Sequence, residues 1–147
     1  MPDYDPTPIF EIFTEIGIIH QLSRARLETQ LPKGLIEPHF AVLNHLIRVG
    51  DGATPQQMAK AFQVPKTSLT HTLKGLETRG LIVMKQNPED GRSKTVWIMP
   101  EGRALRDEVV AGLVPEMMTL LAQLDMEKLL EIRPILTQLR KVLDDNR

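Results

Sequence analysis

The chain has 147 residues, which is enough for one domain or for one domain with a helical appendage. Its apolar fraction of 41% can supply a core, and its charged fraction of 25% is ordinary for a globular protein. The absence of cysteine excludes disulfides, thiolate metal sites and thiol redox switches, and no apolar run approaches the roughly 18 residues of a membrane span. With no secretion signal at its N-terminus either, the chain is expected to be cytoplasmic and to have no membrane partner.

Two helices are predicted in the first third of the chain. Residues 1–6 are expected to be a loose tail, and Thr7-Pro8 is a helix-start signal in which the threonine can act as the cap. Apolar residues at helical spacing from Ile9 to Leu22 predict a helix over about residues 7–30 that ends before Pro32. A second helix carries Phe40 and its apolar neighbours and ends at the glycines that follow residue 49.

Two shorter helices are predicted next. Thr54-Pro55-Gln56-Gln57 combines a capping threonine, a proline in the first turn and a glutamine in the capping-box position. After a turn at residues 63–65, a further helix places Leu69, Leu73 and Leu76 on one face, and Gly80 supplies its left-handed stop.

A hairpin and two long helices complete the chain. The β-prone runs 81–85 and 95–99 flank a polar stretch with an Asp-Gly turn, so we predict a hairpin with a long tip. A fifth helix is expected from about Pro100 to Leu124, with a bend at Pro115. Asp125 is expected to cap a sixth helix, whose apolar seam is interrupted by a kink at Pro134; the seam comprises Leu129, Ile132, Leu136, Leu139 and Leu143.

Two short helices followed by a hairpin are typical of a winged helix-turn-helix, in which the second helix enters the DNA major groove. The leucines of that helix point to the core, so the opposite face is polar and rich in hydrogen-bond donors. An ordinary solvated face is the alternative interpretation. The candidate DNA-binding residues on this face are Lys66, Thr67, Ser68, Thr70, His71 and Lys74.

The hairpin tip adds further candidate contacts. Arg92 follows a tight Asp-Gly turn and could reach into a narrow minor groove, where the negative potential is strongest. Asp90 could hold its guanidinium by an ion pair, and Lys94 would meet phosphate. Taken alone, the tip is also consistent with a good turn and nothing more.

The charge distribution agrees with a nucleic-acid partner. The net charge is −1, but residues 66–106 hold eight basic and four acidic side chains, so this segment carries +4 and the remainder −5. A basic middle between acidic arms is typical of a region that meets phosphate. Chance clustering explains the pattern about equally well when it is considered alone.

Taken in order, these motifs resemble the MarR (multiple antibiotic resistance regulator) family. The matching stretch runs from Thr54 to Arg103, and the resemblance extends over nearly the whole chain. The Leu-Glu-x-x-Gly-Leu-Ile passage matches residues 76–82, and the family's wing motif, an Asp and an Arg separated by one residue, matches Asp90 and Arg92. The resemblance implies a dimeric DNA-binding transcriptional regulator, in most cases a repressor.

The chain also departs from the family at three positions. Pro65 stands before the recognition helix, where a capping Ser or Asp is common, and His71 stands where Arg is frequent. Gly75 stands where a basic or polar residue is common. A glycine inside a helix lowers its stability by roughly 0.5–1 kcal/mol relative to alanine. Fewer phosphate contacts imply weaker or more salt-sensitive binding.

The expected fold class is mainly α with a small β-hairpin wing. We predict a single domain over residues 1–147, in which about 38–100 form the winged helix-turn-helix DNA-binding lobe. Helices at about 7–30 and 101–145 would carry the dimerisation surface, as the resemblance implies. The alternative is that these helices only complete the core of a monomer.

The resemblance also implies a small aromatic or phenolic ligand that releases the protein from DNA. In the family such ligands bind between the dimerisation helices and the DNA-binding lobe. Residues that could line this cleft, but that serve equally well as packing, are Ile16, His20, Phe40, Leu43 and Asn44.

Two other functional classes were weighed. The sequence has no phosphate-binding loop, dinucleotide fingerprint or nucleophile elbow, and its four histidines are scattered, so we expect no enzyme, no cofactor and no metal site. A winged-helix protein-interaction module without sequence-specific DNA binding is the second alternative. Such a module would present an apolar or acidic recognition face, whereas Lys66, Lys74 and Arg92 favour DNA.

Overall fold

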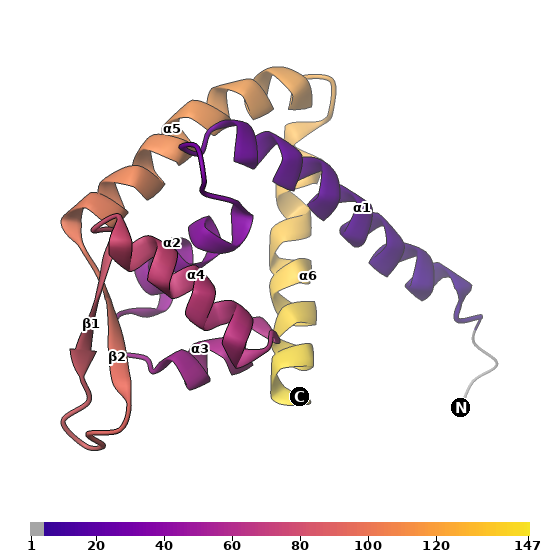
Figure 1. Ribbon diagram of the computed structural model, residues 1–147. Coiled ribbons are helices and arrows are strands. Elements are labelled where there is room, and N and C mark those ends of the chain that lie inside the picture. Colours follow the sequence, from indigo (N-terminus) through magenta and orange to yellow (C-terminus); the bar gives the residue numbers. More distant parts are fainter. Residues whose placement is uncertain (1–4) are drawn as a thin grey trace. The chain divides into compact units, whose positions relative to one another are not determined.

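The structure, a computed structural model, describes residues 5–147, so most of the expected N-terminal tail lies outside the described residues. Six helices and one hairpin follow in the predicted order (Figure 1). Their bounds are α1 Thr7–Thr29, α2 Glu37–Val49, α3 Pro55–Phe62, α4 Lys66–Thr78, β1 Ile82–Gln86, β2 Lys94–Ile98, α5 Pro100–Leu121 and α6 Met126–Asp145. The chain divides into two compact units, one reaching to Ala111 and one from Gly112 to Arg147, and the division falls within α5. The prediction of a mainly α fold with a β-hairpin wing is confirmed.

The start of α1 differs from the prediction in its capping group. Pro6 occupies the N-cap position, so Thr7 is already helical and its hydroxyl does not cap the helix. The Asp5 carboxylate takes that role by accepting the Thr7 N–H at 2.9 Å, and hydrogen bonds with the side chain and then the backbone of Thr7 lower the pKa of Asp5. An acidic group is well placed there because it faces the positive end of the helix dipole.

The capping box of α3 is present as predicted. The Thr54 hydroxyl accepts the Gln57 N–H at 3.2 Å, and the Gln57 side chain accepts the Thr54 N–H at 2.9 Å. The helix ends in a tight turn, because Gln63 adopts the left-handed conformation with φ 54°. This turn separates α3 from α4 by only three residues.

A hydrogen-bonded stop joins α4 to the wing. Gly80 has φ 71°, and its N–H donates to the Glu77 carbonyl while the Leu81 N–H donates to the Leu76 carbonyl. These two bonds form a Schellman motif, which satisfies the last carbonyls of the helix. The Met84 N–H in β1 also donates to the Glu77 carboxylate at 3.3 Å, so the wing is tied directly to α4.

The wing is tied to the loop before α3 as well. The Val96 N–H in β2 donates to the Ala53 carbonyl, and the Gly52 N–H donates to the Val96 carbonyl, both at 2.9 Å. The Asp51 carboxylate accepts the Ile98 N–H at 2.7 Å. The hairpin therefore has a third, short backbone neighbour, and its position relative to α3 and α4 is fixed from both sides.

The core lies beneath these elements. The three leucines of α4 are at most 4% exposed, as the helical spacing predicted. The buried cluster joins α2, α3, α4 and the hairpin, and it consists of Leu35, Val42, Leu43, Leu46, Met58, Ala59, Leu69, Leu73, Leu76, Leu81, Ile82 and Val96. Each fully buried Val, Leu, Ile or Met side chain contributes roughly 1.5–3 kcal/mol to folding stability. This core therefore gives the exposed face of α4 and the wing a stable support.

The last two helices differ from the prediction at one boundary. α5 ends at Leu121 rather than near Leu124, and the loop that follows it is closed by the Leu124 N–H donating to the Leu121 carbonyl. The Asp125 carboxylate accepts the Glu127 and Lys128 N–H groups, so it caps α6 as expected. Both α5 and α6 continue through their internal prolines, Pro115 and Pro134. Over residues 5–147, the structure contains no helix with the length and apolar character that a bilayer span requires.

Candidate nucleic-acid interface

The outer face of α4 is polar and exposed. All six of the residues predicted on this face are exposed, whereas the leucines that alternate with them are buried. The Thr70 hydroxyl donates to the Lys66 carbonyl at 2.8 Å, an i−4 bond that orients the hydroxyl along the helix. The face therefore presents donors and short side chains that allow a close approach of another molecule.

The wing tip is exposed but internally ordered. Asn87 and Ser93 are joined by a backbone bond of 3.2 Å and a side-chain bond of 2.9 Å, and Gln86 donates to the Gly91 carbonyl. Asp90 accepts the Arg92 N–H at 3.0 Å through Oδ1, and the same oxygen lies 3.5 Å from Nε of Arg92. The expected ion pair is therefore present, while the Arg92 side chain stays 95% exposed.

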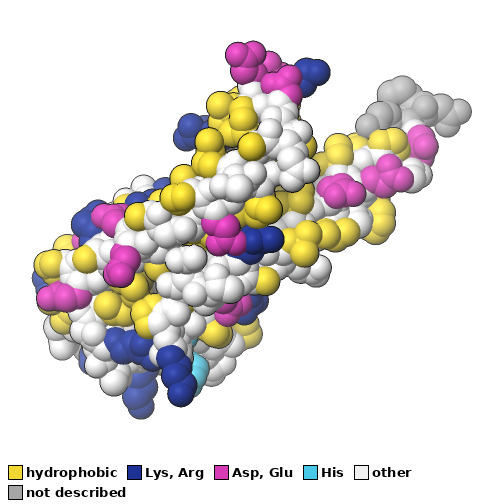
Figure 2. Space-filling view, turned by 90° about the horizontal axis from the view of Figure 1, so that it is seen from above, with side chains coloured by type: hydrophobic (Ala, Val, Ile, Leu, Met, Phe, Trp, Pro, Cys, Tyr) yellow, Lys and Arg dark blue, Asp and Glu magenta, His cyan; other side chains and the backbone are white. Residues whose placement is uncertain are grey.

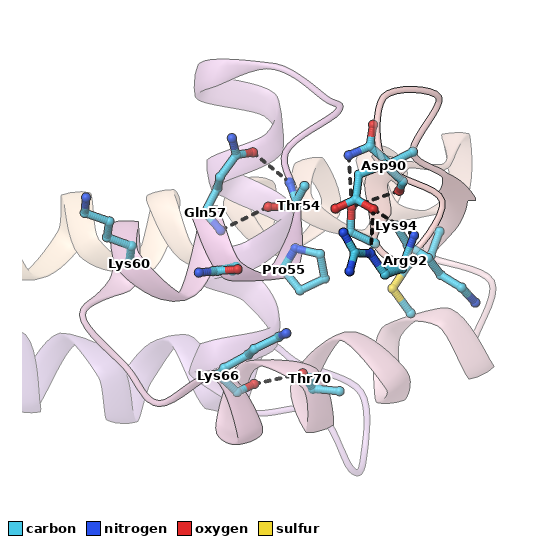
Figure 3. A pocket seen from close by; sticks show the side chains of 13 residues that line it. Thr54, Pro55, Gln57, Lys60, Lys66, Thr70, Asp90, Arg92 and Lys94 are labelled. Carbon is cyan, nitrogen blue, oxygen red and sulfur yellow. Dashed lines mark hydrogen bonds and ion pairs between the residues drawn. The ribbon is translucent and has the colours of Figure 1, made fainter.

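An open groove connects α4 to the wing. Its volume is about 760 Å³, and it lies between the start of α3, the start of α4 and the hairpin tip (Figure 3). Five of the nine predicted DNA-binding residues line it, namely Lys66, Thr70, Asp90, Arg92 and Lys94. Residues almost thirty positions apart in the sequence thus share one surface.

The other four predicted residues lie outside this groove. His71 and Lys74 line a second hollow on the opposite shoulder of α4. Ser68 lines a third hollow between α2, α3 and α4, where its neighbours are largely apolar, and Thr67 is exposed on the helix. The predicted set is therefore spread around the exposed face of α4 and is not gathered at one point.

The start of α3 contributes groove residues that the sequence analysis did not assign. Thr54, Pro55, Gln56, Gln57 and Lys60 line the groove together with the wing and α4. The Thr54-Pro55 start signal places a helix N-terminus there, and such ends attract anions through their free N–H groups and dipole. That signal could have added this turn to the predicted interface.

The groove carries an excess of positive charge. Lys60, Lys66, Arg92 and Lys94 line it, and its one carboxylate, Asp90, is paired with Arg92. Lys85, on the neighbouring strand, does not line the groove, since its ammonium lies 4.4 Å from the centre of the Trp97 ring. Within residues 5–147, no three His, Cys, Asp or Glu side chains are grouped so that they could hold a metal ion.

The predicted ligand-contacting residues differ in how accessible they are. His20 is exposed, whereas Ile16, Phe40 and Asn44 are partly buried and Leu43 is 1% exposed within the core. The Asn44 side-chain oxygen accepts the Arg106 Nε–H at 3.2 Å. Arg106 is thus a polar neighbour of this set that the sequence analysis did not include.

The chain is similar in sequence to known transcriptional regulators. The model of the MarR family matches residues 33–93, from just before α2 to the wing tip. The chain is 29% identical over 105 residues to transcriptional regulator HosA of Escherichia coli O111:H-, which covers 70% of this chain and 72% of HosA. The family match therefore includes α3, α4 and the wing tip as far as Ser93, and it ends just before Lys94.

Solved structures share the fold over almost the whole chain. The transcriptional regulator BldR from Sulfolobus solfataricus superposes with a TM-score of 0.76 at 19% identity, covering 97% of this chain and 99% of BldR. The PcaV transcriptional regulator from Streptomyces coelicolor, solved in complex with its natural ligand, has a TM-score of 0.67 at 19% identity and full coverage of both chains. At these identities the similarity establishes the fold.

Proposed function

We propose that the chain is a DNA-binding transcriptional regulator of the MarR family, a repressor that binds a pseudo-palindromic operator as a homodimer. The observation that carries the proposal is the groove that joins the start of α4 to the wing tip. A surface of this kind follows the DNA backbone from the major groove, where a helix reads base edges, to the adjacent minor groove.

We assign different roles to the residues of this surface. The exposed donors of α4 would contact bases and flanking phosphates in the major groove, with Lys66 and Lys74 as the charged members of that set. Arg92 would enter the minor groove, oriented by Asp90, and Lys94 would contact phosphate. An exposed ion pair such as Asp90–Arg92 contributes little to stability, so its role in this proposal is to orient the guanidinium.

Dimerisation is supported by apolar surface on the long helices. Neither α1 nor α6 contains a buried residue, although α1 is rich in Ile, Leu and Phe and α6 is rich in Leu and Ile. Phe10 is 73% and Leu22 is 65% exposed on α1, and Figure 2 shows this apolar surface along the arm that ends at the grey N-terminal residues. Exposed apolar surface of this extent is typical of an interface. We propose that helices at 7–30 and 101–145 form it.

Release by a small aromatic ligand is the regulatory part of the proposal. PcaV is described with a natural ligand bound, and this chain shares its fold. We propose that Ile16, His20, Phe40, Leu43 and Asn44 contribute to such a site, with Arg106 beside Asn44 as the group that would meet a carboxylate. Because Leu43 is fully buried in this structure, it would contribute through the packing of the cleft wall.

The experiment that tests the function starts with selection of a binding sequence from a random duplex library. Affinity for the selected duplex and for random duplex is then measured over a salt series, since specific and nonspecific binding respond differently to sequence but both depend on salt. We expect an enriched pseudo-palindrome with half-site centres about one helical turn, ~10 bp, apart. Failure to enrich any sequence, with weak binding to all duplexes, would instead indicate a protein-interaction module.

A further inference from the structure

A second concave surface lies on the shoulder of α4 away from the wing. Its volume is about 320 Å³, and it is formed by α4, the first turn of α2 and the loop before α2. Four of its lining side chains bear nitrogen groups that are or can become cationic, and none of its lining residues is acidic; the four are His39, His71, Lys74 and Arg79.

His39 presents a hydrogen-bond donor to this pocket. Its Nδ1 accepts the Ile36 N–H at 2.9 Å, so the neutral ring carries its proton on Nε2. A Cβ atom placed on Gly75 would lie 3.1 Å from that Nε2 and would crowd it. The glycine that departs from the family pattern therefore leaves Nε2 uncovered, and no acceptor for it is present among residues 5–147.

Arg79 supplies positive charge that no carboxylate among residues 5–147 pairs with. Its Nη2 donates to the Lys33 carbonyl at 2.6 Å, which fixes the guanidinium at the pocket edge but leaves its charge uncompensated. In the part of the chain that the structure describes, neither Arg79 nor Lys74 forms an ion pair. Burial lowers the pKa of His39, and the nearby charges of Arg79 and His71 lower it further, as a positive field requires.

We propose that this pocket binds a small free oxyanion, a carboxylate or a phosphate, and that the bound anion competes with DNA for α4. Such a ligand would accept hydrogen bonds from His39 Nε2 and the Arg79 guanidinium and would attract the Lys74 ammonium. His71 and Lys74 also belong to the proposed DNA-contacting face, so an anion held between them would occupy groups that phosphate of the duplex needs. The competition rests on the proposed function, whereas the anion site itself does not.

The anion site can be tested without DNA. Inorganic phosphate is titrated into the protein at pH 7, with sodium chloride adjusted to keep the ionic strength constant, and the histidine ring signals are followed by NMR. We expect the signals of His39 and His71 to shift along a saturable curve while those of His20 and His45 stay in place. Equal shifts of all four signals, or no saturation, would overturn the site.

Variants separate this pocket from general charge effects. Gly75→Ala should abolish the saturable shift because its methyl group covers Nε2 of His39, and Arg79→Gln should weaken it at least tenfold while keeping a donor toward Lys33. Arg103→Gln removes the same charge from an exposed position on α5 and should leave the shift unchanged. A site that survives Gly75→Ala is not the one proposed.

The competition is then measured on the selected duplex. At a phosphate concentration ten times its Kd, DNA affinity at constant ionic strength should fall about tenfold for the wild-type protein and for Arg103→Gln. Arg79→Gln should bind DNA but should no longer respond to phosphate. Saturable phosphate binding with unchanged DNA affinity overturns the competition. Absence of sequence-specific binding in the wild-type protein overturns the proposed function, and the NMR titration still decides the anion site.

Discussion

Arg92 combines a free side chain with a fixed backbone. Its backbone N–H donates to the Asp90 carboxylate within an ordered turn, yet its side chain is 95% exposed to solvent. A side chain in this setting loses little backbone entropy when it inserts into a groove. Minor-groove width varies with sequence, so an arginine placed there senses sequence through shape.

Replacing Arg92 with alanine should weaken specific binding by roughly 1–3 kcal/mol and narrow the difference between specific and random duplex. The measurement is affinity for both duplexes at several salt concentrations. Lys85→Ala is the control, because this wing lysine lies over Trp97 and outside the groove. Unchanged specific affinity in Arg92→Ala would mean that the wing does not enter the groove.

Lys74 should behave differently from Arg92. It lies two turns into α4, where phosphate is the expected partner. Lys74→Ala should therefore weaken specific and random duplex about equally and reduce the slope of log K against log salt by about one. A loss confined to the specific duplex would show that Lys74 contacts a base instead.

The position of α3 depends on its capping box. The two reciprocal bonds between Thr54 and Gln57 satisfy N–H groups that would otherwise have no helical partner. The same turn lines the groove, so the start of this helix serves both stability and the binding surface.

Thr54→Ala should lower the free energy of unfolding by about 1 kcal/mol, since a capping hydroxyl is lost while the proline in the first turn is kept. Urea unfolding should show a lower midpoint with an unchanged slope. Thr119→Ala, at an exposed position inside α5, removes a hydroxyl that donates to the Pro115 carbonyl of its own helix but accepts no N–H at a helix end, and it should not lower the midpoint. Equal midpoints for both variants would contradict the role of the box.

The elements that the sequence predicted well are those with local signals. The Thr54 box, the stop at Gly80 and the Asp125 cap each depend on residues within five positions of one another. The prediction for the start of α1 was wrong in its capping group, because the helix begins one residue earlier than a Thr7 cap requires and the Asp5 carboxylate accepts the Thr7 N–H.

Long-range features could not be predicted in the same way. The backbone hydrogen bond between Ala53 and Val96 joins segments more than forty residues apart, and no local sequence pattern predicts it. The distribution of the recognition face over three hollows has the same origin, because it depends on which elements pack beside α4. The sequence therefore predicted the residues of the face but not how they are grouped.

The long helices carry apolar side chains that the single chain leaves exposed. On α6, Leu136 is 44% exposed and Ile135 is 64% exposed, so neither helps to hold the isolated chain together. In a dimer these side chains would become buried, and a charge among them would be left without a partner.

Leu136→Glu should therefore convert a homodimer into monomers or unfold the assembly, whereas Gln138→Glu adds the same charge at a neighbouring exposed position and should not. Light scattering at micromolar concentration gives the mass of each protein. Leu139, which is half-buried, should tolerate a charge no better than Leu136. A monomeric mass for the wild-type protein would refute the assembly.

The proposed DNA contacts and the proposed dimer surface lie on different residues, and this separation has a genetic consequence. The proposed DNA contacts lie within residues 66–94, whereas the exposed apolar faces lie on α1 and α6, so an Arg92→Ala chain keeps its whole assembly surface. Expressed beside the wild-type gene, such a chain should enter mixed dimers with one competent wing and interfere with repression of an operator-linked reporter. Adding Leu136→Glu to the same chain should abolish the interference, because a subunit that cannot dimerise cannot form mixed dimers with the wild-type protein. A mutant allele that loses only DNA contact should therefore be dominant over the wild-type allele, and a mutant allele that loses dimerisation should be recessive.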